Sequence, residues 1–335
     1  MAELRTIDAD DDGIRIDRWF KRHYPNVTHV LLEKLLRKGE VRLDGKRADS
    51  STRLASGQVM RLPPQVIHDK VELKPKPVVA TTRKLEDNIL YMDKHLFVLN
   101  KPSGLATQGG SGLTEHVDGM LDQLVFEKAI RPKLVHRLDK DTSGVLIIAR
   151  TAQAAAGLSR DLAARDTSKI YWALVKGTPP QKRGIIKGAL AKEGTRGANE
   201  RMAMVDDDED GAKFALTEYA VMGTASTEMT WVAAKPVTGR THQIRVHLAS
   251  IGTPIMGDFK YGGVDVRGKG GIPDRLHLHA RSIDLHRPDG ERLKVTAPLP
   301  PHMEKSWKLL GFDPEDKRDP FPVLKPAAKK KRPRR

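Results

Sequence analysis

The chain has 335 residues, no cysteine and a formal net charge of +16, because 59 Lys and Arg side chains outnumber 43 Asp and Glu. The absence of cysteine excludes disulfides, thiolate zinc sites and a cysteine nucleophile. The apolar runs are too short to span a membrane. The acidic start, MAELRTIDADDDG, lacks the apolar core of a secretory signal, and we expect residues 1–13 to be an acidic N-terminal extension. We therefore expect a cytoplasmic protein with two domains, at least one of which buries a substantial core.

The positive charge is concentrated in two segments. Residues 13–70 carry a net charge of +7 and residues 329–335, KKKRPRR, carry +6, whereas residues 1–12 are net −4. This distribution favours a polyanionic partner, most simply nucleic acid, bound with release of counterions. The alternative is a soluble basic protein without such a partner. A membrane surface is a weaker alternative, because no basic stretch accompanies a strong apolar helix face.

Two short helices are predicted near the N-terminus. Residues 14–24 have an amphipathic pattern that Pro25 ends. Residues 29–38 have a second such pattern, with Thr28 as the N-cap and Gly39 as the C-cap. The side chains expected to face inward are Ile16, Trp19 and Phe20 in the first helix and Val30, Leu31 and Leu35, with Leu32 as a further candidate, in the second.

A hairpin and a cluster of basic side chains follow the second helix. Residues 40–43 alternate in polarity, and Asp44-Gly45 predicts the tight turn of a β-hairpin. A solvated face would mix charge signs more evenly than the cluster Lys34, Arg37, Lys38, Arg42, Lys46 and Arg47. Residues 14–63 resemble the small RNA-binding module named for small-subunit ribosomal protein S4. The resemblance implies that the second helix and the turn present basic side chains to structured RNA.

The remaining chain is predicted to be a linker, a larger domain and a tail. Residues 64–84 are rich in proline and polar side chains, which is typical of an extended linker. Residues 85–310 alternate short β-like runs with turns and include a helix at 152–164, which indicates a mixed α+β domain. Residues 206–210, DDDED, indicate an acidic loop. Residues 311–335 become polar, proline-rich and basic, and we expect them to be disordered.

Asp139 is the first candidate for chemistry. It lies in residues 134–150, LVHRLDKDTSGVLIIAR, where an apolar pair, a turn and a buried strand hold it at the mouth of a sheet. Taken alone, an Asp before a turn more often caps backbone amides. Tyr171 and Trp172 lie in a predicted strand at residues 169–177, KIYWALVKG, and point to opposite faces. One must be buried and the other can be offered to a ligand, although core packing is the simpler interpretation of either.

Residues 238–248, TGRTHQIRVHL, gather Arg240, His242, Arg245 and His247 beside a predicted strand at residues 243–250, in which Arg245 and His247 share one face. Two cations on one face require a nearby anion or exposure to solvent. Alternatively, the strand lies at the edge of the sheet, where charged side chains prevent pairing with another chain. Residues 100–112, NKPSGLATQGGSG, form a glycine-rich loop around Lys101 that is not a phosphate-binding P-loop. His277 and His279 alternate on a predicted strand without acidic or thiol partners, so we expect no metal site.

Taken in this order, the motifs resemble those of the RluA-type pseudouridine synthases, and NKPSGLATQGGSG resembles the loop that opens their catalytic domain. The resemblance covers residues 14–300, and HRLD-x-x-TSG is highly specific. The QGGSG loop and the order of modules are most similar to the branch of large-subunit rRNA synthase C. The resemblance implies an α+β catalytic domain with a mixed, mainly antiparallel sheet, and an isomerisation of uridine that uses no cofactor or metal.

The resemblance also implies roles for individual residues. Asp139 would be the essential carboxylate, Tyr171 would contact the target base and Arg245 would pair with the Asp. Arg137 would help to open the RNA around the flipped nucleotide. Further RNA contacts are expected from Arg240 and from the basic cluster Lys34, Arg37, Lys38 and Arg42.

Three alternatives stay open at this stage. The chain could modify another RNA, or it could be a non-catalytic ribosome-assembly factor. A glycosidase-like hydrolase has only Asp141 as a nearby second acid. Uridine C5-methylation is excluded, because it typically uses a cysteine thiolate together with a methyl-donor site. We expect large-subunit ribosomal RNA as the partner, no small-molecule cofactor and a monomer.

Overall fold

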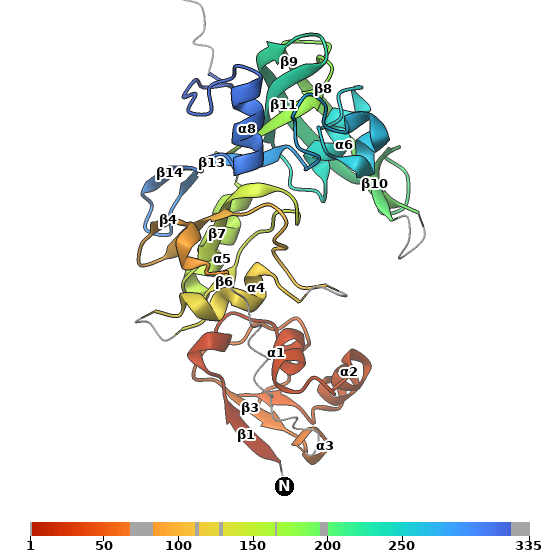
Figure 1. The fold of residues 1–335 in the computed structure, drawn as a ribbon. Coiled ribbons are helices and arrows are strands. Elements are labelled where there is room, and N and C mark those ends of the chain that lie inside the picture. Colours follow the sequence, from red (N-terminus) through yellow and green to blue (C-terminus); the bar gives the residue numbers. More distant parts are fainter. Residues whose placement is uncertain are drawn as a thin grey trace, which may run out of the picture. The chain divides into compact units, whose positions relative to one another are not determined.

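The structure is a computed structural model that describes residues 2–67, 83–110, 114–126, 130–164, 166–194 and 200–322. The chain forms two compact units. The first comprises residues 1–168 and 282–297, and the second comprises residues 169–281 and 298–335 (Figure 1). Strand β13 (Leu278–His286) begins in the second unit and ends in the first.

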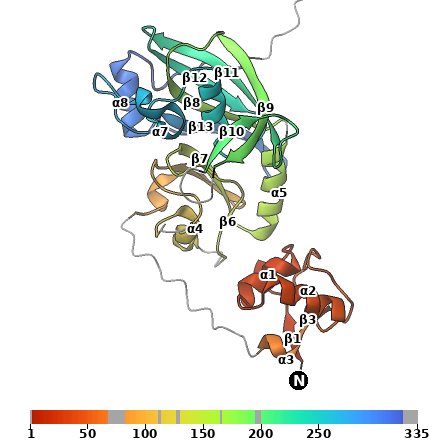
Figure 2. The same ribbon diagram turned by 90° about the vertical axis from the view of Figure 1, so that its right-hand side faces the viewer.

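The N-terminal part of the first unit is a small α+β module with its own sheet. The sheet has the order β1-β3-β2, with antiparallel neighbours, and Figure 2 labels β1 and β3 together with the helices of the module. Its elements are β1 (Glu3–Thr6), the 3-10 helix η1 (Ala9–Asp11), α1 (Ile16–His23), α2 (His29–Lys38), β2 (Arg42–Leu43), β3 (Val59–Leu62) and α3 (Pro64–Ile67). Its core contains Trp19, Phe20 and Tyr24 from α1 and the turn that follows it.

The helix caps predicted from the sequence are confirmed. The Thr28 hydroxyl accepts a hydrogen bond from Leu31 N, and Gly39 has a left-handed φ of 69°. The predicted inner face of α2 is partly wrong, because Val30 is 79% exposed and the buried residues are Leu32, Leu35 and Leu36. An eight- to ten-residue helix with several adjacent leucines fits more than one stripe, and only the partner surface selects it.

The predicted hairpin is also partly wrong. Leu43 and Lys46 exchange backbone hydrogen bonds around the Asp44-Gly45 turn, but β2 pairs with β3 rather than with the residues after the turn. The acidic N-terminal segment is not a separate extension. Its β1 pairs with β3, and the carboxylate of Asp11 is buried and bonded to Arg22 and His23. The module therefore starts before residue 14.

The predicted linker begins later than expected, because residues 64–67 form α3. Residues 68–82 lie outside the described part of the chain. Beyond them the first unit contains two 3-10 helices, η2 (Glu86–Asn88) and η3 (Leu121–Leu124), with β4 (Ile89–Met92), β5 (Leu96–Lys101), α4 (Val117–Met120), β6 (Lys133–Leu134), β7 (Ser143–Ala149), α5 (Ala152–Ala163) and β14 (Arg292–Thr296). The order is β7-β5-β4, with β6 on β7 and β14 on β13, and these pairs are antiparallel.

The second unit is built on long antiparallel strands in the order β10-β9-β11-β12-β8. Its elements are β8 (Ser168–Lys176), β9 (Arg183–Glu193), β10 (Arg201–Val205), β11 (Lys213–Ala225), β12 (Met229–Pro236), α6 (Gln243–Ser250), α7 (Phe259–Gly262), the 3-10 helix η4 (Gly263–Val266) and α8 (Pro301–Leu309). The α+β class with a mainly antiparallel sheet is confirmed.

The two faces of this sheet pack on different helices. On one face, alternate residues of β8 and β12 such as Ala173 and Val232 pack with Ile244 and Leu248 of α6. On the other face, Trp172 and Trp231 pack with Trp307 of α8. The period of two in β8 therefore sends Tyr171 to the α6 face and Trp172 to the α8 face.

The predicted strand at residues 243–250 is wrong, because these residues form the helix α6. The spacing Gln243, Ile244, His247, Leu248 fits one helical face as well as the alternation fits a strand, and eight residues are too few to decide. Five of the eight are buried, and the Gln243 amide donates to Leu216 O and Thr217 Oγ1 at 2.9 Å each.

The start of the predicted disordered tail is also corrected. Residues 311–322 are described and follow α8, and the Phe312 ring lies 5.6 Å from Trp231 and 6.0 Å from Trp307. Arg318 donates to Met222 O at 3.0 Å. Burial of one aromatic ring anchors a segment whose composition is otherwise polar. Residues 323–335 lie outside the described part. No helix among the described residues is long and apolar enough to cross a membrane.

Candidate active site

Asp139 lies half-buried in the loop between β6 and β7. The glycine-rich segment after β5 holds the backbone on both sides of it. Thr107 Oγ1 donates to Leu138 O at 2.7 Å and accepts from Leu138 N at 3.1 Å. Gly104 N donates to Lys140 O at 3.0 Å, and Ser103 Oγ donates to Asp141 O at 2.9 Å. Two separate sequence motifs therefore fold together to fix one carboxylate.

Lys101 is the buried cation of this loop, and its side chain is only 1% exposed. Its Nζ donates to Pro102 O at 3.0 Å, Leu105 O at 2.7 Å and Lys140 O at 3.0 Å. Burial lowers the pKa of Lys101 to about 7, while the charges of Asp141 and Asp139 act to raise it. The Lys101 ammonium therefore interacts electrostatically with Asp139 and Asp141. It also donates a hydrogen bond to the carbonyl oxygen of Lys140, the residue between them. A buried lysine of this kind is typical of functional sites.

The neighbours of Asp139 in the HRLD motif have different environments. His136 Nε2 accepts a hydrogen bond from Ile147 N at 2.8 Å, so the imidazole ties the loop to β7. Arg137 is exposed, as required of a side chain that contacts RNA. This placement agrees with an arginine that is available to a ligand beside a histidine that holds the loop.

In the second unit, Tyr171 lies beside α6. It is half-buried and packs against the cluster that contains Ile244 and Leu248. Trp172 on the opposite face is buried in the tryptophan cluster. The structure therefore brings Tyr171 together with the helix that carries Arg245, both within the second unit.

Arg245 is paired with an acid that the sequence analysis did not single out. Its Nε and Nη2 donate to Asp258 Oδ2 and Oδ1, each at 2.8 Å. Its guanidinium lies 5.0 Å from the ring centre of Tyr261. Asp258 and Tyr261 belong to GDFKYGG, whose turn composition gave no sign of a charged partner for α6. Asp139 belongs to the first unit, so its pairing with Arg245 stays a prediction.

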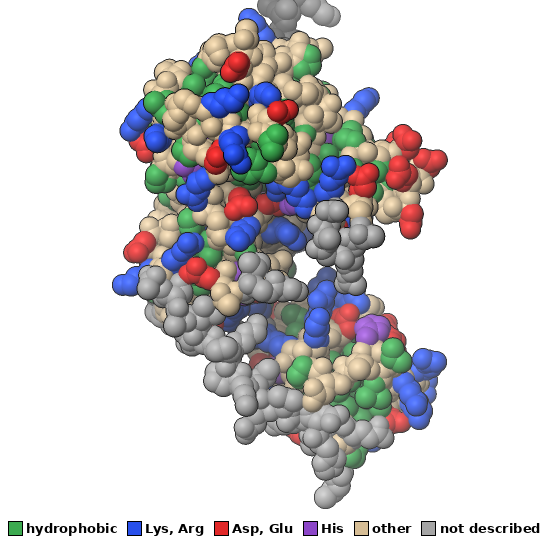
Figure 3. Space-filling model, turned by 45° about the vertical axis from the view of Figure 1, so that its right-hand side comes forward, with side chains coloured by type: hydrophobic (Ala, Val, Ile, Leu, Met, Phe, Trp, Pro, Cys, Tyr) green, Lys and Arg blue, Asp and Glu red, His purple; other side chains and the backbone are tan. Residues whose placement is uncertain are grey.

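The predicted RNA-contacting residues lie mainly on the surface. Arg240 is exposed and its Nε donates to Phe214 O at 3.0 Å. Lys34, Arg37 and Lys38 are exposed on α2, and Figure 3 shows Lys and Arg side chains gathered on the module. Arg42 is different, because it donates to Gly39 O at 3.1 Å and Gly45 O at 3.3 Å. It therefore braces the helix end against the turn.

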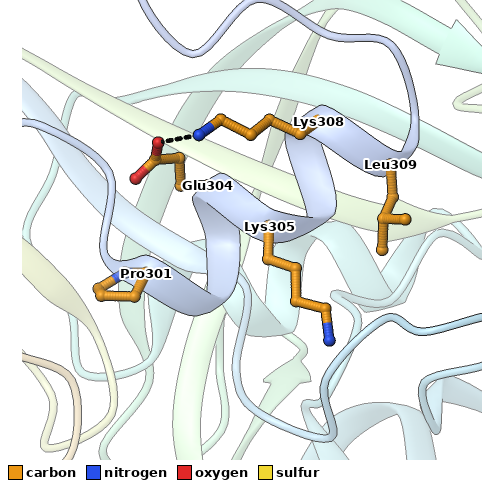
Figure 4. A pocket seen from close by; sticks show the side chains of 5 residues that line it. All are labelled: Pro301, Glu304, Lys305, Lys308 and Leu309. Atoms are coloured by element: carbon orange, nitrogen blue, oxygen red, sulfur yellow. Dashed lines mark ion pairs between the residues drawn. The ribbon is translucent and has the colours of Figure 1, made fainter.

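Other features of the described residues hold no catalytic group. A pocket of about 440 Å³ on α8 is lined by Pro301, Glu304, Lys305, Lys308 and Leu309, in which Glu304 and Lys308 form an ion pair (Figure 4). In the described part of the chain, no group of three or more His, Asp or Glu side chains could hold a metal ion. The acidic residues 206–210 form an exposed turn between β10 and β11.

Comparison with known proteins identifies the family. Residues 95–250 match the family described as RNA pseudouridylate synthase. The chain is 38% identical over 326 residues to "Ribosomal large subunit pseudouridine synthase C" of Vibrio cholerae, which covers 91% of this chain and 98% of that protein. It is 34% identical to "RNA pseudouridine synthase 4, mitochondrial" of Arabidopsis thaliana, with 88% and 78% covered. These matches confirm the resemblance to the synthase C branch.

A solved structure is also similar. The protein "Human RNA Pseudouridylate Synthase Domain Containing 4" superposes with a TM-score of 0.56 and 29% identity, over 68% of this chain and 94% of that one. The family match begins at β5 and ends at α6, so it contains Asp139, Tyr171 and Arg245. The chain belongs to the family of RNA pseudouridylate synthases.

Proposed function

We propose that this enzyme converts specific uridines of large-subunit ribosomal RNA to pseudouridine, with Asp139 as the catalytic carboxylate. The observation that carries the proposal is the loop of the HRLD motif, in which Lys101, Gly104 and Thr107 bond the backbone on either side of Asp139. Relatives that share nearly their whole length with this chain are named as large-subunit synthases.

The chemistry explains why a fixed carboxylate is needed. Isomerisation breaks the N1–C1′ bond, rotates the uracil and joins its C5 to C1′, after which C5 loses its proton and N1 takes one up. A carboxylate near C1′ can act as a nucleophile, or stabilise oxocarbenium-like charge and take a ribose proton. Positioning supplies much of the rate, because a misplacement of about 1 Å can cost a hundredfold. The bonds to the Asp139 loop provide this positioning in advance of RNA binding.

Tyr171 and Arg245 complete the proposed site. A stacked base cannot react, so the nucleotide must leave the stack at a cost of about a few kcal/mol. Stacking on an aromatic face returns roughly 1–3 kcal/mol per base, and Tyr171 is the half-buried aromatic that can offer such a face. Arg245 is assigned as the partner of the Asp139 carboxylate, through guanidinium N–H groups other than the two that bond Asp258. Arg137 helps to keep the RNA open.

The remaining RNA contacts are assigned to the N-terminal module and to Arg240. The module is taken as an S4-type RNA-binding unit on the support of its exposed basic helix α2, with Lys34, Arg37 and Lys38 toward phosphate. Arg42 acts there by holding the turn as well as by its charge. We further propose a cytoplasmic monomer that needs no cofactor, since the reaction is an isomerisation.

The test is Asp139→Asn, which keeps the shape of the side chain and removes its charge. The variant is expected to fold and to bind substrate RNA as the wild type does, and to form no pseudouridine in rRNA that lacks the modification. Pseudouridine mapping and an RNA-binding isotherm measure the two properties. Normal product from the variant would contradict the mechanism. If Asp139→Asn has no effect in cells but charge reversal at Lys34, Arg37 and Lys38 is harmful, the results favour a non-catalytic assembly factor.

A further inference from the structure

The ion pair between Arg245 and Asp258 is almost completely removed from water. The side chains are 11% and 1% exposed, respectively, and the two hydrogen bonds at 2.8 Å join the fork of the guanidinium to both carboxylate oxygens. A bidentate pair of this kind fixes the plane and direction of the guanidinium. A buried pair is retained at a desolvation penalty, so stability alone is a weak reason for its presence.

The backbone around Asp258 is fixed as tightly as its side chain. Gly257 has a φ of 73°, and a Cβ at this position would lie 1.9 Å from Arg275 O. Asp258 O accepts hydrogen bonds from Tyr261 N at 3.2 Å and Gly262 N at 2.8 Å. The Asp258 carboxylate therefore belongs to a turn that packs closely against the residues leading into β13. This packing prevents it from moving together with Arg245.

Tyr261 holds the guanidinium from a second direction. Its ring centre lies 5.0 Å from Arg245 Cζ, a cation–π distance. Its hydroxyl accepts a hydrogen bond from Met202 N at 3.2 Å and lies 2.7 Å from His242 Nδ1. His242 has a φ of 54° at the start of α6. Two independent supports, one at the edge of the guanidinium and one at its face, thus converge on Arg245.

We propose that Asp258 and Tyr261 are positioning residues that orient the Arg245 guanidinium for the reaction. The inference rests on the proposed function, in which Arg245 supports the Asp139 carboxylate. Because Asp258 already balances the charge of Arg245, the arginine contributes directed N–H donors more than a net positive charge. Its orientation, rather than its mere presence, then limits the rate.

A double-mutant cycle tests the proposal. The variants are Asp258→Asn, Arg245→Met and the double variant, and the readouts are the single-turnover rate with saturating enzyme and the Kd for substrate RNA. Asp258→Asn is expected to slow the rate about tenfold to a hundredfold and to change the Kd less than about threefold. In the Arg245→Met background the same change is expected to cost less than about twofold, because there is no arginine left to orient. Asp265→Asn, an exposed position in the same segment, is the control with wild-type rate.

The ring of Tyr261 provides a second route if Asp258→Asn does not fold. Tyr261→Leu is expected to slow the rate several-fold with the ion pair retained, and Tyr261→Phe to stay closer to wild type because the stacked ring remains. Equal rate losses for Asp258→Asn in both backgrounds overturn the inference, and so do wild-type rates for Asp258→Asn or Tyr261→Leu. An impaired Arg245→Met with a normal Asp258→Asn defeats only the inference. A normal Arg245→Met defeats the proposed role of Arg245 as well.

Discussion

At the residue scale, Lys101 is the side chain whose environment differs most from its usual one. Lys101 is 1% exposed and bonded to three carbonyl oxygens, and an apolar replacement would remove all three bonds, of which the one to Lys140 O is backed by a second donor, Gly104 N. Its Coulombic interaction with Asp139 and Asp141 adds an electrostatic role. The loop and the acid it supports are thus coupled through one ammonium group.

Lys101→Met is therefore expected to lower both stability and activity. The methionine fills a similar volume but donates no hydrogen bond, and a buried group that loses its partner costs about 1–3 kcal/mol. Denaturant unfolding measures the stability, and the single-turnover rate measures the effect on the Asp139 loop. Ser103→Ala is the comparison, since it removes a single side-chain bond to Asp141 O in the same loop, and we expect it to lower both properties less than Lys101→Met does. Wild-type rate and stability in Lys101→Met would contradict this role.

The residue scale also shows what the sequence could and could not predict. Asp139, Arg137 and Tyr171 were identifiable because they lie inside contiguous motifs, and the structure gives each an environment that suits its predicted role. Their roles remain predictions. Asp258 could not be found, because its partner Arg245 is 13 residues away and their meeting depends on the turn at Gly257. Pairing across a turn has no local signature.

At the element scale, His277, directly before β13, and His302 of α8 are buried against each other, and burial lowers the pKa of both. His277 Nε2 bonds Ser306 Oγ at 2.8 Å, and its Nδ1 lies 2.7 Å from Arg275 O. The pKa of His277 is lowered to about 4, mainly by burial and in smaller part by the charges of His302 and Arg275. Burial also lowers the pKa of His247 on α6 to about 4.

Acid is therefore expected to destabilise the second unit before it affects most carboxylates. The ordinary histidine pKa is about 6.5. As the pH falls from 6.5 to 4, these histidines therefore become protonated in the unfolded chain while they stay mostly neutral in the folded chain. Each of the two histidines then removes up to about 3 kcal/mol of stability. Unfolding by denaturant at pH 7, 5.5 and 4.5 measures the loss. His277→Asn, which cannot titrate, is expected to be less stable at pH 7 but to show a shallower decline. An unchanged slope would refute the assignment.

Most elements were predictable where the periodicity was long or the caps were explicit, as in α1, α2 and α5. The prediction at α6 was wrong because its eight residues fit the helical period as well as the strand period. Packing against the sheet face that α6 covers selects the helix. The sequence predicts β-like runs within residues 85–310 but does not single out β9 and β11. Their alternation is interrupted by glycine and by exposed apolar residues such as Ile185 and Phe214.

At the scale of the whole molecule, we expect the concentrated positive charge to attract RNA and other residues to perform the chemistry. The basic segment 329–335 lies outside the described residues, but its six positive charges follow from the sequence. Deleting it is expected to reduce the salt dependence of RNA binding, by up to about 0.7–0.9 in the log–log slope for each phosphate that the segment neutralises. The modified uridine should stay the same. Binding isotherms at several salt concentrations and pseudouridine mapping provide the measurement, and a shifted modification position would show that the segment reads RNA specifically.

The division of β13 between the two units has a consequence for synthesis on the ribosome. The first unit needs residues 282–297, which emerge only after most of the second unit has been made. At about 5–20 residues per second, roughly 6 to 23 seconds separate residue 168 from residue 282. The N-terminal module, whose strands all lie within residues 3–62, can fold during that interval. The rest of the first unit has an incomplete sheet until then, so the N-terminal module can fold well before the unit that contains Asp139 is complete.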